Sequence, residues 1–196
     1  MHGVLVQLPL PEFIEDGEIV NAIAPQKDVD GLHEANLAKL HLNSSAAHML
    51  PCTPLGCYEL IRSTGVPIAG SRSVVIGRSR LVGRPMAAML TNLDSTVTLC
   101  HTLTPDLPEV VRQADILVVA AGERGLVRGD WLKPGVCVID VGITPFSDEQ
   151  GRPRVAGDVR LAEAWGLASH ITPVPGGVGP MTVAMLLANT HAAWLN

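Results

Sequence analysis

The chain has 196 residues, which allows one domain or two small ones, and hydrophobic residues make up 47% of it, enough for a buried core. Nineteen acidic side chains outnumber fourteen basic ones, so the net charge of −5 opposes binding to phosphate backbones. The three Trp, two Phe and one Tyr also leave little aromatic surface for stacking on bases. Nucleic acid is therefore not an expected partner.

The cysteines and histidines form no pattern typical of a metal site or a disulfide framework. Four cysteines lie without a Cys-x-x-Cys pair, as expected for reduced thiols: Cys52, Cys57, Cys100 and Cys137. Five histidines lack any spacing to an acid, nucleophile or second ligand that would indicate a role: His33, His41, His48, His170 and His191. The sequence has neither an apolar run of about 18 residues nor a signal peptide, so we expect a cytoplasmic protein that does not bind a membrane.

Along the chain, short β-branched runs alternate with helical stretches, as in a parallel sheet with helices on its faces. The N-terminal part is expected to form a strand over residues 3–8, a helix over 14–23, a helical turn over 34–41 and a helix over 53–63 with Thr53 as its N-cap. Strands follow at 73–76, 96–100, 116–120 and 136–141, and helices at 85–92 and 107–113. The polar residues 148–154 resemble a linker, and an apolar helix entered through Pro180 covers 181–195. The pattern predicts an α/β fold: a Rossmann-like doubly wound parallel sheet plus the remainder of a second α/β lobe.

A glycine-containing loop follows the strand expected at residues 73–76. In VVIGRSRLVGRP, Gly77 and Gly83 lie between this strand and a helix. The free amides of the first helical turn and the positive end of the helix dipole favour a pyrophosphate there. Gly77 permits the tight turn, and Gly83 lets the backbone approach the ligand. Because the spacing differs from Gly-x-Gly-x-x-Gly, a purely structural turn remains the alternative.

Two features of this region bear on the choice of dinucleotide. At the end of the next strand, where NAD-binding folds carry a carboxylate for the ribose, the chain has His101 and Thr102. Arg78, Arg80 and Arg84 can contact a phosphate, although one or two of them can equally be solvated surface. The sequence therefore favours NADP over NAD.

Two further loops are candidates for contacts with a ring system. PQKDVDG carries Asp28 and Asp30, which are too few for a good cation site but can hydrogen-bond a heterocycle; capping of a turn is the alternative. TPVPGGVGPMT, at residues 172–182, is a rigid segment whose exposed amides can lie against a ring or a phosphate. An ordinary Gly-Pro connection is the alternative for this second loop.

Four motifs, in this order and separation, carry a resemblance to a known family: GVLVQLPLP, PQKDVDG, GRSRLVGRP and TPVPGGVGPMTVAMLL. Together they resemble the bifunctional methylenetetrahydrofolate dehydrogenase/methenyltetrahydrofolate cyclohydrolase family. The resemblance implies NADP-dependent oxidation of 5,10-methylenetetrahydrofolate to 5,10-methenyltetrahydrofolate, and hydrolysis of that product to 10-formyltetrahydrofolate. It also implies a homodimer and three parts: a partial folate-binding catalytic lobe at 1–50, an NADP-binding domain at 51–175, and a helix at 176–196 that returns to the catalytic lobe.

When the family's functional residues are matched to this sequence position by position, the resemblance implies a set of site residues. It makes Gln7 and Asp30 catalytic, and it assigns Asp30, Pro175, Gly176, Gly177 and Thr182 to the tetrahydrofolate substrate. It assigns Gly77, Arg78, Ser79, Gly83, Thr102, Gly142 and Ile143 to the cofactor, and no residue to a metal. One local difference is Thr144, where the family more often has asparagine.

The larger difference from the family concerns its principal catalytic lysine. The family has a further N-terminal segment before GVLVQLP, with a Tyr-x-x-x-Lys pair that contains this lysine. This chain has only Tyr58, and its lysines are Lys27, Lys39 and Lys133. We therefore expect a truncated chain: either an enzyme, recorded in part or working with a separate N-terminal fragment, or a catalytically inactive subunit that binds NADP and folate. An unrelated Rossmann dehydrogenase does not account for PQKDVDG or the PGGVGP loop.

Overall fold

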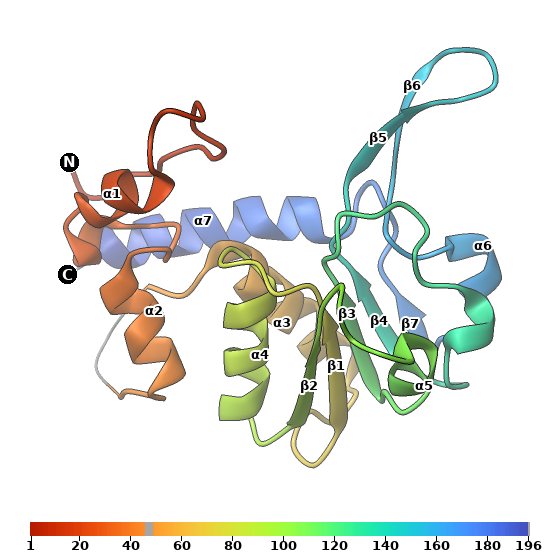
Figure 1. The fold of residues 1–196 in the computed structure, drawn as a ribbon. Helices are drawn as coiled ribbons and strands as arrows, with labels where there is room; N and C mark the ends of the chain where they lie inside the picture. Colours follow the sequence, from red (N-terminus) through yellow and green to blue (C-terminus); the bar gives the residue numbers. More distant parts are fainter. Residues whose placement is uncertain (46–48, 196) are drawn as a thin grey trace.

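The computed structural model describes residues 1–45 and 49–195, so that His48 lies outside the described residues. A five-stranded parallel sheet forms its centre (Figure 1). The order is β2-β1-β3-β4-β7, with β1 at Arg72–Ile76, β2 at Thr96–Cys100, β3 at Ile116–Val119, β4 at Cys137–Asp140 and β7 at His170–Ile171. Because β2 and β3 pair with opposite edges of β1, the strand order reverses there. This is the switch point at which open α/β sheets bind ligands, and the predicted Rossmann-like doubly wound fold is confirmed.

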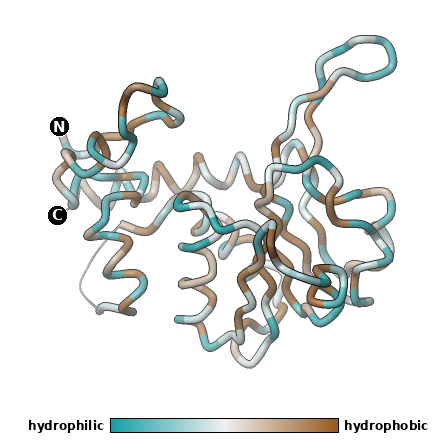
Figure 2. Tube along the Cα trace, in the orientation of Figure 1, coloured by the Kyte–Doolittle hydropathy of each residue, from teal (hydrophilic) through white to brown (hydrophobic). Residues whose placement is uncertain are grey.

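Helices cover both faces of the sheet. One face carries α3 (Cys52–Thr64) and α4 (Gly83–Asn92), and the other carries α5 (Leu107–Val111), the short 3₁₀ helix η2 (Gly129–Trp131) and α6 (Leu161–Ala164). Successive residues of β1 point to opposite faces: Val75 packs in the cluster of α3 and α4, whereas Val74 packs in the cluster of α5 and α6. Strands β3 and β4 are buried along their whole length, and the centre of the sheet is largely brown in Figure 2, as expected for strands that are buried on both faces.

The N-terminal segment contains α1 (Asp16–Asn21), the 3₁₀ helix η1 (Pro25–Lys27) and α2 (Glu34–His41). The strand predicted at residues 3–8 is wrong. Val4 alone forms a bridge, to Asp28, through hydrogen bonds from Val4 N to Lys27 O (2.7 Å) and from Val29 N to Val4 O (3.3 Å). An apolar run becomes a parallel strand only where neighbouring strands continue the ladder, and the described residues supply one bridge.

Residues 148–154, predicted as a linker, instead include the tip of an antiparallel hairpin. Its strands are β5 (Thr144–Ser147) and β6 (Pro153–Ala156), and it projects away from the sheet (Figure 1). At the tip, Gly151 has a positive φ of 72°, and the Asp148 carboxylate accepts backbone hydrogen bonds from Gln150 and Arg152. Prolines in both strands hid the pattern, because proline is depleted in strands.

Several helix ends differ from the predicted ones. Helix α1 is shorter than 14–23, α4 begins at Gly83 rather than Pro85, and α5 ends at Val111. Helix α3 begins at Cys52 with Pro51 as its N-cap, so that the predicted cap Thr53 is already helical. Helix α7 (Val178–Leu195) begins two residues before Pro180. Helices α3, α4 and α7 thus begin before the predicted residue, and the cause is the same in each. The amides of the first helical turn have no partner within the helix, so a proline is tolerated there.

Helix α7 connects the sheet to the N-terminal segment. It runs beside α3 and ends near α1 (Figure 1). Near its C-terminus, the buried Asn189 donates from Nδ2 to the carbonyls of Val29 and Leu50, each at 2.9 Å. Ala193 packs with Val29 in a small apolar cluster. Helix α7 thus holds the loop that contains Asp30. None of the helices in the described part of the chain has the length and hydropathy of a membrane span.

We expect Asn189→Ala to lower the free energy of unfolding by about 1–3 kcal/mol, because the buried carbonyl oxygen of Val29 and the part-buried one of Leu50 lose their donor. A suitable control is Thr190→Ala, which removes an exposed hydroxyl on the same helix turn, bonded to Leu186 O. Surface changes of this kind alter stability by about 0.5 kcal/mol or less. Urea denaturation of both variants tests the difference, and equal midpoints would contradict a role for Asn189 in holding the loop.

Candidate functional site

The loop after β1 forms a cradle that leaves no room for side chains at its two glycines. Gly77 has φ of 105°, and a Cβ placed on it would lie 2.1 Å from Ala120 O. A Cβ on Gly83 would lie 1.8 Å from Gly77 O. Gly83 opens α4, so the unpaired amides of this helix face the turn made by Gly77. This is the geometry in which a strand, a tight loop and a helix N-terminus bind a pyrophosphate.

Most polar side chains of this loop form hydrogen bonds within the protein, and one, Arg78, does not. The Ser79 hydroxyl accepts hydrogen bonds from Val82 N (3.1 Å) and Gly83 N (3.5 Å). Arg80 donates to Leu32 O at 3.2 Å, and Arg84 donates from Nε to Arg78 O at 3.1 Å. Among the described residues, the structure gives the Arg78 guanidinium no hydrogen bond or ion pair. Arg78 is therefore the arginine available to a phosphate.

The loop after β2 lies beside this cradle. Strands β1 and β2 end in register, Ile76 opposite Cys100, and Gly77 N donates to Cys100 O at 2.9 Å. The next residues turn sharply, with His101 N donating to Thr104 Oγ1, and Thr102 is left exposed. Arg78 and Thr102 thus follow the adjacent ends of two paired strands, as a site for a 2′-phosphate requires.

The two carboxylates of the PQKDVDG loop have different roles. Asp28 is buried, and its Oδ2 accepts from His33 N (2.7 Å) and from Asn36 Nδ2 (3.0 Å), so it holds the start of α2. The capping interpretation is therefore correct for Asp28. Asp30 instead lines a cavity, and burial raises the pKa of its carboxyl, while a hydrogen bond with Cys52 acts in the opposite direction. The structure thus distinguishes two residues that the sequence left equivalent.

The cavity at Asp30 has a volume of about 300 Å³ and brings together three predicted site residues, Gln7, Asp30 and Thr182. They come from the N-terminal segment, the loop before α2 and the second turn of α7, respectively. Gln7 is exposed and donates to Leu8 O at 2.9 Å, and the Thr182 hydroxyl donates to Thr53 Oγ1 at 3.1 Å. Leu81 and Val82 also line this cavity, and they belong to the loop between β1 and α4 (residues 77–82), which we call the phosphate loop.

Cys52 belongs to this cavity, although the sequence indicated only a reduced thiol. Its Sγ donates to Val29 O at 3.2 Å, and Asn189 Nδ2 lies 3.5 Å from the sulfur. Burial, together with the neighbouring Asp30, raises the pKa of the Cys52 thiol to about 12. The thiol is therefore uncharged at neutral pH and acts as a hydrogen-bond partner in the wall, not as a nucleophile. All four cysteines are free and buried.

The remaining predicted residues meet in a second, smaller cavity of about 260 Å³. Gly142 and Ile143, after β4, lie there with Pro175, Gly176 and Gly177 of the loop before α7. The structure thus brings two of the residues predicted for the cofactor, Gly142 and Ile143, to the loop predicted to lie against the folate. Pro175 to Gly177 do not line the cavity that contains Asp30.

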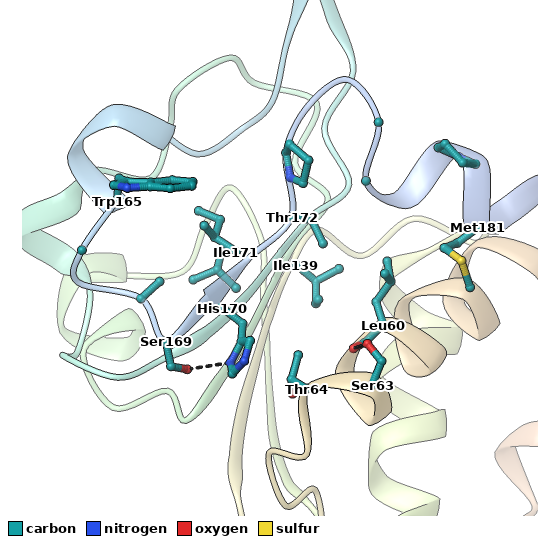
Figure 3. Close-up of a pocket in the computed structure, with 17 residues that line it drawn as sticks. Leu60, Ser63, Thr64, Ile139, Trp165, Ser169, His170, Ile171, Thr172 and Met181 are labelled. Carbon is teal, nitrogen blue, oxygen red and sulfur yellow. Dashed lines mark hydrogen bonds between the residues drawn. The ribbon is translucent and has the colours of Figure 1, made fainter.

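A third cavity, of about 690 Å³, lies at the β7 edge of the sheet (Figure 3), and it shares Gly176 and Gly177 with the cavity at Gly142. Figure 3 shows Leu60 and Met181 on one side of it and Trp165, Ile171 and Thr172 on the other. Its lining offers hydroxyl groups and the His170 imidazole, but no carboxylate, lysine or arginine among the described residues. Size alone therefore does not locate the chemistry, and we place the candidate site at Asp30 and the phosphate loop. No group of three or more His, Cys, Asp or Glu among the described residues could hold a metal.

Comparisons with known proteins agree with this arrangement. A family described as "Tetrahydrofolate dehydrogenase/cyclohydrolase, NAD(P)-binding domain" matches residues 51–196. The chain belongs to this family. The bifunctional protein FolD of Gluconobacter oxydans (strain 621H) is 55% identical over 193 residues, which are 98% of this chain and 63% of that protein. The chain thus spans slightly less than two thirds of this relative's length.

Solved structures of family members have the same fold. The bifunctional enzyme FolD from Campylobacter jejuni superposes with a TM-score of 0.93 at 49% identity, over 98% of this chain and 66% of that one. The Trypanosoma brucei enzyme, complexed with NADP cofactor and inhibitor, has a TM-score of 0.93 at 46% identity, over 99% of this chain and 67% of that one. The resemblance drawn from the four motifs is therefore confirmed.

Proposed function

We propose that the chain provides the NADP site and part of the folate site of a methylenetetrahydrofolate dehydrogenase/methenyltetrahydrofolate cyclohydrolase of one-carbon metabolism. The proposal rests on one observation, that the phosphate loop contributes to both sites. Its residues Leu81 and Val82 also line the cavity that contains Asp30. Ligands at these two places would be neighbours, as a reaction between them requires. The Trypanosoma brucei relative with its NADP cofactor supports the choice of dinucleotide.

The residues present fit a dinucleotide. Close packing of Gly77 against Ala120 O and of Gly83 against Gly77 O fixes the turn before α4, where the first amides of that helix would bind a pyrophosphate. The Arg78 guanidinium and the Thr102 hydroxyl would bind the 2′-phosphate. When bound, NADP would accept a hydride from the methylene carbon of the folate. Gly142 and Ile143 would lie beside the nicotinamide.

The folate side of the proposed reaction uses the Asp30 cavity. Asp30 would bind the pterin ring through its carboxyl, and Pro175, Gly176 and Gly177 would lie against the folate. Loss of hydride leaves the 5,10-methenyl cation, to which water adds, and opening of the ring then gives 10-formyltetrahydrofolate. This second step needs proton transfer, for which positioned side chains give about 10²- to 10⁴-fold acceleration. Gln7 and Asp30 are the proposed catalytic residues of this chain.

A second candidate function follows from the lysines. None of the three lysines lines the Asp30 cavity among the described residues. This observation supports either an enzyme whose lysine lies in an N-terminal segment, of the same protein or of a separate fragment, or a catalytically inactive subunit that binds NADP and folate. We favour the enzyme, because the residues proposed to contact both ligands are present.

Turnover measurements distinguish the two candidates. The chain is assayed with 5,10-methylenetetrahydrofolate and NADP alone, with a fragment that carries the Tyr-x-x-x-Lys helix, and with the same fragment after Lys→Ala. We expect NADPH to form with the intact fragment, and 10-formyl product to require its lysine. NADP binding without product in every arm would identify the inactive subunit. Absence of NADP binding would contradict both candidates.

Three further features belong to this proposal. We propose the division into a partial catalytic lobe at 1–50, an NADP-binding domain at 51–175 and a returning helix at 176–196; the contacts of α7 with Val29 and Leu50 support it. We also propose a homodimer, to be tested by sedimentation velocity. The free, buried cysteines support a cytoplasmic location. The 10-formyl product would supply purine and amino-acid biosynthesis.

A further inference from the structure

Two buried carboxylates lie behind the loops at the carboxyl ends of β3 and β4, and neither belongs to the residues assigned so far. Asp140 is 4% exposed and Asp158 is 0% exposed. Asp140 ends β4, and Asp158 follows the hairpin β5–β6. A carboxyl group at such a depth is costly unless hydrogen bonds compensate it, so its contacts indicate what it does.

Asp140 connects the loop after β4 to the segment after the hairpin. Its Oδ1 accepts from Gly142 N and from Asp158 N, each at 3.0 Å, and its Oδ2 accepts from Val159 N at 2.9 Å. A Cβ on Gly157 would lie 2.0 Å from Asp140 Oδ2, so only glycine leaves room for this contact. The loop that contains Gly142 is therefore anchored by a side chain of the preceding strand.

Asp158 extends this connection to the loop after β3. Its Oδ2 accepts from Ala121 N at 2.7 Å and from Gly122 N at 2.8 Å. Its own backbone carbonyl accepts from Val127 N at 2.9 Å. Ala121 follows Ala120, whose carbonyl borders the position that a Cβ on Gly77 would occupy. One carboxyl thus holds the loop that packs against the phosphate cradle.

The other oxygen of Asp158 lies against Gly142. A Cβ on Gly142 would be 2.3 Å from Asp158 Oδ1, and this oxygen has no hydrogen-bond partner. Asp158 therefore requires a glycine at position 142. Through its two oxygens, Asp158 contacts both loops that flank the space in front of β3 and β4.

We propose that Asp158 is a positioning residue for the dinucleotide: it sets the loop at Ala121 and Gly122 against the loop at Gly142 and Ile143, so that both face the nicotinamide half. This inference rests on the proposed NADP site. Asp158 does not touch the ligand itself, because it is completely buried.

The contacts also predict which replacement keeps the function. Burial raises the pKa of Asp158, although hydrogen bonds from the backbone amides of Gly122, Ala121 and Glu123 act in the opposite direction. Burial raises the pKa of Asp140 in the same way, and the charge of Asp158 adds to that effect. An asparagine at 158 keeps an acceptor for Ala121 N and Gly122 N without adding volume. Alanine removes the acceptor shared by the amides of Ala121 and Gly122, so the side chain at 158 no longer holds this loop.

The test compares two ligands that differ only in the nicotinamide. Asp158→Ala and Asp158→Asn are titrated by calorimetry with NADP and with 2′-phospho-ADP-ribose, which lacks the nicotinamide ring. For Asp158→Ala we expect the Kd for NADP to rise about tenfold or more, as for the loss of one or two hydrogen bonds, and the Kd for 2′-phospho-ADP-ribose to change about threefold or less. Asp158→Asn should stay within about threefold of the natural chain for both ligands.

The Ser95→Ala variant is the control that distinguishes a positioning role of Asp158 from a general loss of stability. Ser95 is buried at the opposite end of the sheet, where its hydroxyl bonds Ser71 and Ser73, so Ser95→Ala removes buried hydrogen bonds far from the loops. This variant should lower the melting temperature and leave both Kd values unchanged. Equal weakening of both ligands by Asp158→Ala, or no weakening of either, would overturn the proposal.

A second measurement needs no variant and applies if Asp158→Ala does not fold. Amide hydrogen exchange at residues 121–122 and 142–143 of the natural chain should slow more with NADP than with 2′-phospho-ADP-ribose. Equal protection by the two ligands would overturn the proposal. If neither ligand binds the natural chain, the proposed NADP site fails instead, so the two failures are distinguishable.

Discussion

Gly77→Ala is expected to abolish dinucleotide binding and to lower the free energy of unfolding by about 3 kcal/mol or more. An L-residue at positive φ costs about 1–2 kcal/mol, and forcing an additional carbon into a filled space costs about 1–3 kcal/mol. At Gly77 both apply, since φ is 105° and the new Cβ would lie 2.1 Å from Ala120 O. The loop must therefore shift at the place where the phosphates would bind. Chemical denaturation and NADP calorimetry measure the two effects.

Gly70→Ala is the matched control. Gly70 also has a positive φ, 75°, but a Cβ there meets nothing within 4 Å. It precedes β1, at the opposite end of the strand from Gly77, so its effect on NADP should be absent. Both variants place alanine at a positive φ, so the difference between their free energies of unfolding measures the cost of the contact between the new Cβ and Ala120 O. Comparable NADP affinity in both would show that the loop after β1 does not contact the ligand.

Arg78→Ala is expected to weaken NADP binding by about 10- to 100-fold, and NAD binding far less. A hydrogen bond to a charged group contributes about 1.5–3 kcal/mol, and each 1.4 kcal/mol is a factor of ten in affinity. Arg78 is the arginine of the loop without a protein partner among the described residues, so its removal should cost little stability. Arg78→Lys should recover part of the affinity, because lysine keeps the charge but loses the planar pair of donors.

The control for charge is Arg112→Ala, which removes an exposed arginine that pairs with Glu109 on α5. Its net charge change is the same, but it lies away from the phosphate loop. An equal loss of NADP affinity in Arg112→Ala and Arg78→Ala would indicate a general electrostatic effect. Equal weakening of NADP and NAD by Arg78→Ala would contradict its assignment to the 2′-phosphate.

The sequence predicted four of the five strands of the central sheet, and β1, β3 and β4 were recognisable as short apolar runs that are almost wholly buried. It did not predict β7, which has only two residues. The run at 3–8 has the same composition, yet it makes only one bridge, since composition does not reveal whether a neighbouring strand exists. The hairpin was missed because Pro145 and Pro153 argue against strands, although an isolated two-stranded hairpin leaves room for proline.

For the site, the motifs identified the loops, and the structure showed which member of each loop is free for a ligand. Asp28 and Asp30 are equivalent in sequence, and only the contacts of Asp28 with His33 N and Asn36 show that it is structural. Cys52 and Asp158 were missed for a common reason. Their partners are mainly backbone groups or residues far along the chain. Because every residue except proline has the same backbone N–H and C=O groups, the sequence does not indicate which of them a side chain will contact.

The loop after β1 contributes to two proposed binding sites. Its first residues form the turn proposed to bind the phosphates, and its Leu81 and Val82 line the Asp30 cavity. A ligand that displaces or stiffens one end of so short a segment alters the other end. Occupancy of the two places is therefore expected to be cooperative, and thermodynamic linkage makes the effect mutual. The factor by which a folate changes the Kd of the dinucleotide must equal the factor by which the dinucleotide changes the Kd of the folate.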